Sequence, residues 1–128
     1  MESQECTDVW FRTHLPLEEI AAVLDAPVRI TDGENYWEWV IADLAGVEID
    51  ITRTHTTAPE KTDTRIFRVA GPSDERELPQ RTLRQLVAGL QRAGMDPIYL
   101  GRWKYREGND FDYVVHEKIT AQESPLSQ

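Results

Sequence analysis

The sequence contains few of the residues and patterns that build redox, metal or membrane sites. Only one of its 128 residues is a cysteine, so an intramolecular disulfide and a cysteine metal cluster are both excluded. No apolar run approaches the roughly 20 residues that a helix needs to cross a bilayer. The first ten residues, MESQECTDVW, do not have the basic and apolar regions of a signal peptide. We therefore expect a cytoplasmic protein that makes no membrane contact.

Motifs for catalysis and cofactor binding are also missing. There is no glycine-rich dinucleotide loop, no Walker loop and no G-x-S-x-G elbow. The three histidines, His14, His55 and His116, do not fall at the spacings of a metal site. We expect no enzymatic activity, no cofactor and no bound metal.

The charge is distributed very unevenly. Residues 1–60 contain no lysine, and 13 Asp and Glu against 3 Arg give them a net charge of −10. Residues 61–128 contain 10 acids and 11 bases, a net charge of +1, so the two halves add up to −9. A phosphate backbone normally requires a basic surface, which argues against direct nucleic-acid binding. A concentrated negative field suits a basic protein partner.

The length and composition predict one globular domain over residues 1–128. Hydrophobic residues make up 40% of the chain, and four Trp, four Tyr and three Phe argue against disorder. The polar ends, residues 1–7 and 120–128, are expected to be flexible.

Periodicity predicts six strands and two helices. Strands are expected at residues 8–14, 36–44, 47–54, 64–70, 98–106 and 111–119, whereas residues 28–35 fit a loop or a short strand. Helices are expected at residues 16–25 and 79–93, because apolar side chains recur there at helical spacing: Leu17, Ile20, Ala21 and Leu24 in the first, and Leu83, Leu86, Val87 and Leu90 in the second.

This order, β-α-β-β-β-α-β-β, predicts an α+β fold. The simplest packing is a two-layer sandwich of split β-α-β type, in which both helices cover one face of an antiparallel sheet. The other face of the sheet would be open to a partner.

The orientation of residues 36–44 decides what that open face presents. Trp37 and Trp39 share one side of the strand and Glu38 takes the other. Aromatic residues are common both in cores and at binding hot spots, so both orientations are possible. Because burying a glutamate is costly, we expect the tryptophans to face inward and Glu38 to face outward with Glu48 and Asp50.

The main functional hypothesis is a binding module that uses this acidic face. Its candidate partner-binding residues are Asp32, Glu34, Glu38, Asp43, Glu48 and Asp50. An alternative is a small-molecule or enzymatic domain with a pocket near His55, Asp112, Tyr113 and His116. A homodimer formed through the sheet or its edge is a third, so the sequence leaves open whether the chain is a monomer or a homodimer.

Three stretches resemble a known group of proteins. These are VWFRTHLPLEEIAAVL, VEIDITR and RTLRQLVAGLQRAGMDPIYLG. Their layout is a short strand, a helix, an acidic strand pair and a long arginine-bearing helix that ends in Ala-Gly, and it is similar to that of the small acidic immunity proteins of bacterial polymorphic toxin systems. The resemblance implies a protein that binds a toxin domain and blocks its active site, and it carries no role for any single residue. The final hairpin, at residues 98–119, is longer than in that layout.

Overall fold

The computed structural model describes residues 6–34, 37–54, 62–69, 76–105 and 111–121. Within these ranges it contains two helices and seven strands, arranged along the chain as β1 (Asp8–Phe11), α1 (Leu17–Val23), β2 (Val28–Glu34), β3 (Trp37–Leu44), β4 (Val47–Thr54), β5 (Thr64–Arg68), α2 (Gln80–Arg92), β6 (Ile98–Tyr105) and β7 (Phe111–Ile119).

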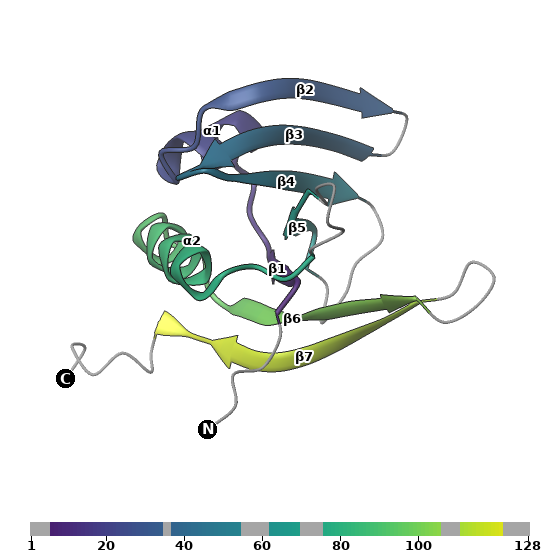
Figure 1. The fold of residues 1–128 in the computed structure, drawn as a ribbon. Helices are drawn as coiled ribbons and strands as arrows, with labels where there is room; N and C mark the ends of the chain where they lie inside the picture. The colour runs from purple at the N-terminus through teal and green to yellow at the C-terminus, as the bar shows by residue number, and fades with distance from the viewer. Residues whose placement is uncertain (1–5, 35–36, 55–61, 70–75, 106–110, 122–128) are drawn as a thin grey trace.

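The strands form one antiparallel sheet in the order β2-β3-β4-β5-β1-β6-β7. In Figure 1, β2 to β4 lie at the top, β6 and β7 at the bottom, and both helices at the left. The predicted α+β class is confirmed. Residues 28–34, for which the sequence left a loop and a strand open, form the edge strand β2, so the element order has one strand more than predicted. Neither helix is long and apolar enough to cross a bilayer, as far as the described ranges extend.

A single core joins the helices to one face of the sheet. The predicted alternation in β4 is confirmed, since Val47, Ile49 and Ile51 are all buried. The predicted helix stripes enter the same cluster, with Ile20 and Leu86 fully buried in it. The apolar residues of the strands and the apolar stripes of the helices exclude water by packing against each other. We call this face of the sheet the helix-facing side and the opposite face the outer face.

A tight turn at Ala45 and Gly46 sets the register between β3 and β4. Ala45 and Gly46 both have positive φ, 50° and 89°, which is the pattern of a two-residue type I′ turn. The backbone N–H of Gly46 donates to Oδ1 of Asp43 at 2.8 Å. Strand pairing then runs without interruption from Leu44 opposite Val47 to Trp37 opposite Thr54.

The prediction for the orientation of the tryptophan pair was wrong. Val40, Ala42 and Leu44 are the buried residues of β3, so Trp37 and Trp39 lie on the outer face and Glu38 has the helix-facing parity. Glu38 avoids the expected burial cost because it lies near the end of the strand, where it is exposed and paired in register with Arg53.

The outer face is not open throughout, because β1 is buried on both sides. Asp8 and Trp10 point to this face and are almost completely enclosed. Asp8 forms an ion pair with Arg65, with 2.7 Å between Oδ2 and Nε, and the Arg65 guanidinium lies 4.3 Å above the ring of Phe67. The Trp10 and Tyr113 rings meet edge to face, with 5.3 Å between centroids.

The described residues of the two chain ends contact the rest of the fold. Cys6 and Thr7 are buried, and the backbone N–H of Leu78 donates to the Cys6 carbonyl at 2.8 Å. The N–H of Ala121 donates to Oδ1 of Asp96 at 3.2 Å. Residues 1–5 and 122–128 lie outside the described ranges.

Candidate functional site

An aromatic and acidic surface lies on the outer face at the β2 edge of the sheet. Ile30 is 52% exposed and Trp37 is 50% exposed. Trp37 and Trp39 meet edge to face, with 5.8 Å between ring centroids. The strand register places Asp32 opposite Trp39 and Glu34 opposite Trp37. These five residues are called the Trp–acid patch.

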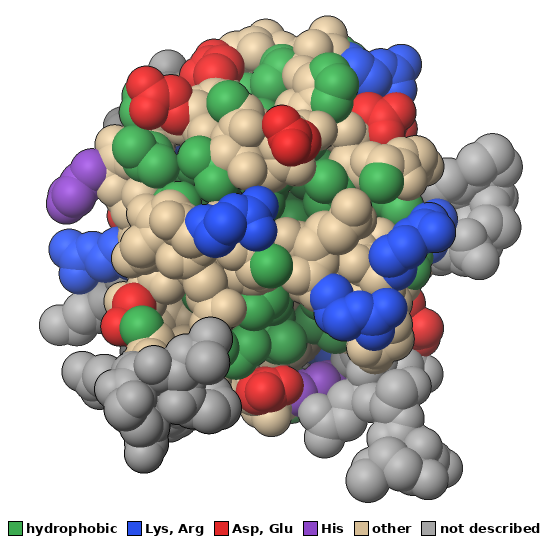
Figure 2. All heavy atoms as spheres, turned by 90° about the vertical axis from the view of Figure 1, so that its left-hand side faces the viewer, with side chains coloured by type: hydrophobic (Ala, Val, Ile, Leu, Met, Phe, Trp, Pro, Cys, Tyr) green, Lys and Arg blue, Asp and Glu red, His purple; other side chains and the backbone are tan. Residues whose placement is uncertain are grey.

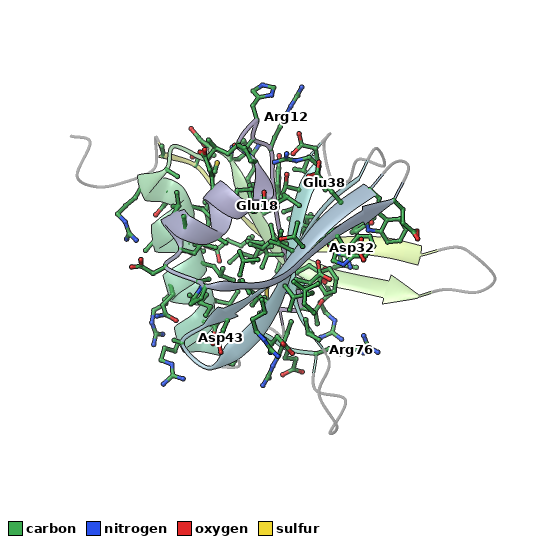
Figure 3. All side chains as sticks on the ribbon, turned by 90° about the horizontal axis from the view of Figure 1, so that it is seen from above. Arg12, Glu18, Asp32, Glu38, Asp43 and Arg76 are labelled. Atoms are coloured by element: carbon green, nitrogen blue, oxygen red, sulfur yellow. The ribbon has the colours of Figure 1, made fainter. Side chains whose placement is uncertain are left out.

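Two other predicted acids, Asp43 and Glu48, lie near the β3–β4 turn. They face each other across the two strands. Glu48 forms an ion pair with Arg29, and Asp43 caps the turn through Gly46. Asp43 is four residues further along β3 than Trp39, a separation of about 13 Å along the strand. Figure 3 accordingly shows Asp43 far from Asp32.

The remaining two predicted acids, Asp50 and Glu38, are not part of the Trp–acid patch. Asp50 is half-buried on the outer face and accepts a hydrogen bond from the Thr52 hydroxyl. Burial raises the pKa of Asp50, although the Thr52 hydrogen bond and the Arg65 charge act in the opposite direction. Glu38 lies on the helix-facing side of β3, opposite to the face that carries the tryptophans. The structure therefore brings Asp32 and Glu34 together beside the tryptophans, whereas Asp43 and Glu48 lie at the other end of the strands.

The side of the molecule that carries the helices has a different character. Figure 2 shows this side with acidic and basic side chains interspersed over its surface. Exposed arginines of α2, such as Arg81 and Arg92, contribute part of its positive charge. The Trp–acid patch differs from this side because the exposed Trp37 ring and the half-buried Trp39 ring lie next to the carboxylates of Glu34 and Asp32.

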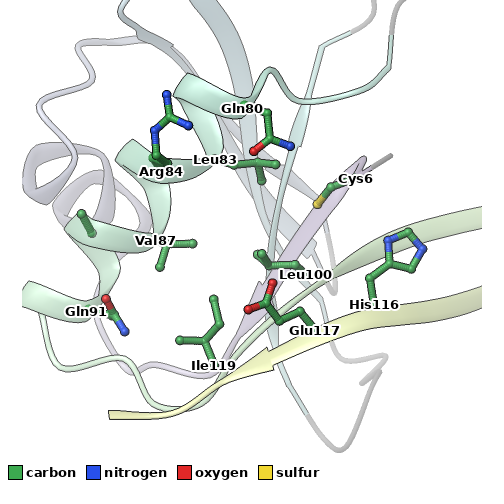
Figure 4. Close-up of a pocket in the computed structure, with 11 residues that line it drawn as sticks. Cys6, Gln80, Leu83, Arg84, Val87, Gln91, Leu100, His116, Glu117 and Ile119 are labelled. Atoms are coloured by element: carbon green, nitrogen blue, oxygen red, sulfur yellow. The ribbon is translucent and has the colours of Figure 1, made fainter. Parts of the chain in front are cut away.

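A groove of about 730 Å³ separates α2 from β6 and β7 on the helix-facing side. Figure 4 shows Leu83 and Val87 of α2 on one wall, with Leu100 and Ile119 of the sheet on the other. Polar side chains complete the lining: Gln80, Arg84, Gln91, His116 and Glu117. The sequence predicted only His116 among these residues.

A β-bulge in β7 brings two consecutive polar residues to this groove. Leu100 pairs with Glu117 and Gly101 pairs with Val115, so His116 is the additional residue of the bulge. A bulge redirects side chains that would otherwise alternate between faces. In Figure 4 the Glu117 carboxylate points into the groove and His116 lies beyond it, toward Cys6. The His116 Nδ1 atom is buried and has no hydrogen-bond partner among the described residues.

Cys6 lines the same groove but is not suited to nucleophilic chemistry. Its thiol donates to the Asp8 carbonyl, with 3.4 Å between sulfur and oxygen. Burial raises the pKa of the Cys6 thiol to about 11, which keeps it protonated at neutral pH.

The groove does not unite the residues of the alternative hypothesis. Tyr113 packs on Trp10 at the outer face, where burial raises its pKa. His55 and the Asp112 side chain lie outside the described residues. Among the described residues, no three His, Cys, Asp or Glu side chains are grouped so that they could hold a metal ion.

Comparison with known proteins adds no relative: no family model, no curated protein and no solved structure matches the chain.

Proposed function

We propose that this chain is a non-enzymatic protein that binds a basic protein partner through the Trp–acid patch. The observation that carries the proposal is the exposure of Trp37 and Ile30 directly beside Asp32 and Glu34. Exposed aromatic side chains commonly provide the central contacts of an interface. Adjacent carboxylates would attract lysine and arginine side chains and speed association.

The proposed partner is a bacterial toxin domain, and the proposed activity is neutralisation in the cytoplasm. A toxin that acts on nucleic acid needs a cationic cleft, and an acidic patch with an aromatic anchor complements such a cleft. The resemblance to immunity proteins supports the same role. A two-layer arrangement, with both helices on one face of the sheet, would leave the outer face available for occlusion.

A double charge reversal tests the patch. With the product of a neighbouring toxin gene as the partner, Asp32→Lys/Glu34→Lys is expected to slow association at least tenfold and to weaken its dependence on salt. The reason is that these substitutions remove two attractive charges and add two repulsive ones at the contact. Association rates measured by stopped-flow fluorescence at low and high salt provide the readout.

The matched control is Glu18→Lys/Glu77→Lys, which makes the same change in net charge at exposed positions outside the patch. Its association rate is expected to fall much less. Equal slowing in both variants would show that net charge matters and the patch does not, and unchanged association in the patch variant would reject the proposed surface.

A second candidate function is small-molecule binding in the α2–β7 groove. The specific observation that favours it is the bulge, which places His116 and Glu117 beside the apolar walls that Leu83, Val87, Leu100 and Ile119 form. Apolar walls with a few polar groups are typical of ligand sites. The matching ligand class is an amine with an apolar body, whose ammonium group would meet the Glu117 carboxylate.

Phenethylamine is a suitable probe of the groove. It is expected to shift the NMR signals of Val87 and Ile119, and Glu117→Gln should weaken its binding about tenfold because a charge-assisted hydrogen bond is lost. Phenylpropionate, which has a similar body and the opposite charge, serves as the control. Equal binding of both probes, or of neither, would count against an amine site.

A further inference from the structure

Among the described residues, no strand pairs with the outer edge of β2, which lies next to the Trp–acid patch. All seven residues of β2 are exposed, and it is the terminal strand of the sheet. An exposed edge is a template for pairing with another strand, and many proteins cover or disrupt such edges. The direction of the backbone groups decides which residues of β2 are available for pairing.

The hydrogen-bond pattern of β3 gives that direction. The N–H of Asp43 donates to the carbonyl of Pro27 at 3.0 Å, so the Asp43 backbone points toward β2. In an antiparallel ladder the backbone groups alternate between the two neighbouring strands. Ile41, Trp39 and Trp37 therefore also point toward β2, and they lie opposite Ile30, Asp32 and Glu34. The residues between these, Thr31 and Gly33, consequently direct their N–H and C=O groups to the free edge.

An independent contact supports this assignment. The N–H of Gly33 donates to Oδ1 of Asp32 at 2.8 Å, as expected for a donor that is not used in the β2–β3 ladder. Asp32 therefore has two features in this structure: its carboxylate covers an edge donor, and it belongs to the Trp–acid patch. A lysine or arginine that engages the Asp32 carboxylate would release the Gly33 N–H for pairing.

We propose that an extended segment of the partner pairs with β2 as an additional strand of the sheet. The backbones of Thr31 and Gly33 would bond to the segment, and its basic side chains, alternating with apolar ones, would lie beside Asp32 and Glu34. The bulge between Val28 and Ile30 ends the regular edge, so pairing is confined to residues 30–34. This inference rests on the proposed function and names how the partner binds.

Charge favours a basic segment over a second copy of this chain. A second β2 would bring its own Asp32 and Glu34 to the same narrow region of the outer face, and neighbouring like charges destabilise a strand pair. A segment that alternates lysine with an aliphatic residue supplies the opposite charge at the spacing of a strand.

The test uses the full chain and two synthetic peptides of the same composition. The first peptide, KVKVKVKV, alternates lysine with valine, and the second, KKKKVVVV, separates them into blocks. The alternating peptide is expected to slow amide hydrogen exchange at Thr31 and Gly33 at least tenfold, and the block peptide to leave it unchanged. Thr31→Pro removes an edge N–H and spares the β2–β3 ladder, so it should weaken binding of the alternating peptide about tenfold. Thr31→Ala is the matched control, because it removes the side chain and retains the N–H.

The outcomes separate this inference from the proposed function. If the alternating peptide shifts the Trp37 indole signal and Asp32→Lys/Glu34→Lys abolishes that shift, the patch binds cations. Absence of amide protection in the same sample would then overturn strand pairing alone. Absence of any peptide binding would also overturn strand pairing, and toxin association would still test the patch. Protection that appears without peptide and rises with protein concentration would identify a second copy as the occupant.

Discussion

Replacing Asp8 with alanine is expected to lower the free energy of unfolding by about 3 to 5 kcal/mol, because it leaves a largely buried guanidinium without its counter-ion. The Asp8 side chain is 3% exposed and that of Arg65 is 27% exposed, with 2.7 Å between the paired atoms. Asp8 also accepts a hydrogen bond from the Thr7 hydroxyl, which the substitution would remove. Urea unfolding monitored by circular dichroism measures the change.

The exposed ion pair between Arg29 and Glu48 provides the control. Its side chains are 59% and 38% exposed, so Glu48→Ala should cost about 1 kcal/mol or less. Replacing the buried pair together, as Asp8→Leu/Arg65→Met, should cost less than Asp8→Ala alone, because neither charge is then left buried without a partner. Equal losses for Asp8→Ala and Glu48→Ala would contradict the role assigned to the buried pair.

Gly101→Ala is expected to destabilise the fold by about 3 kcal/mol, because the added methyl group has no space. A Cβ atom at this position would lie 2.0 Å from the carbonyl oxygen of Val114 and 3.0 Å from the Trp10 ring. The first of these neighbours is backbone, so relief requires β6 and β7 to move apart. Because Gly101 adjoins the β7 bulge, the same movement should reshape the α2–β7 groove.

Thermal and urea unfolding of Gly101→Ala measure this effect, with Gly33→Ala as the matched substitution in a strand. At Gly33 the nearest atom to an added Cβ is 3.3 Å away, on an exposed edge, so its cost should stay below about 1 kcal/mol. Similar stabilities of the two variants would show that the β6–β7 contact is not as restrictive as the distances indicate.

The parts of the fold that the sequence predicted are those in which one face is buried. Both helices were predicted from their apolar stripes, and β4 was predicted from its alternation of apolar and polar residues. The strand β2 could not be assigned in the same way, because it is exposed on both faces and burial imposes no period on it. The bulge at His116 left no sequence pattern either; it lies opposite Leu100 and Gly101, where the Val114 backbone approaches Gly101 closely.

The candidate surface was predicted in part, and for a physical reason. Asp32 and Glu34 were named as contacts from charge alone, whereas the neighbouring tryptophans were assigned to the core. That error came from treating Glu38 as a residue in the middle of a strand, where burial would be costly. Glu38 lies near the end of the strand, where it is exposed, so the cost of burying its charge does not arise. Because side chains alternate along the strand, Trp37 and Trp39 then lie on the outer face. The proposal of a basic partner comes from charge, and only the register showed which acids lie next to aromatic side chains.

The alternation of the strands also bears on how such a protein could diversify. Each residue of β3 and β4 belongs either to the helix-facing side or to the outer face, so the two sets can vary separately. Under the proposed function, substitutions at Trp37, Trp39 or Asp32 would alter partner choice and leave Val40, Ile49 and Ile51 in place to maintain the fold. A lineage could thus change its binding specificity rapidly on an unchanged scaffold.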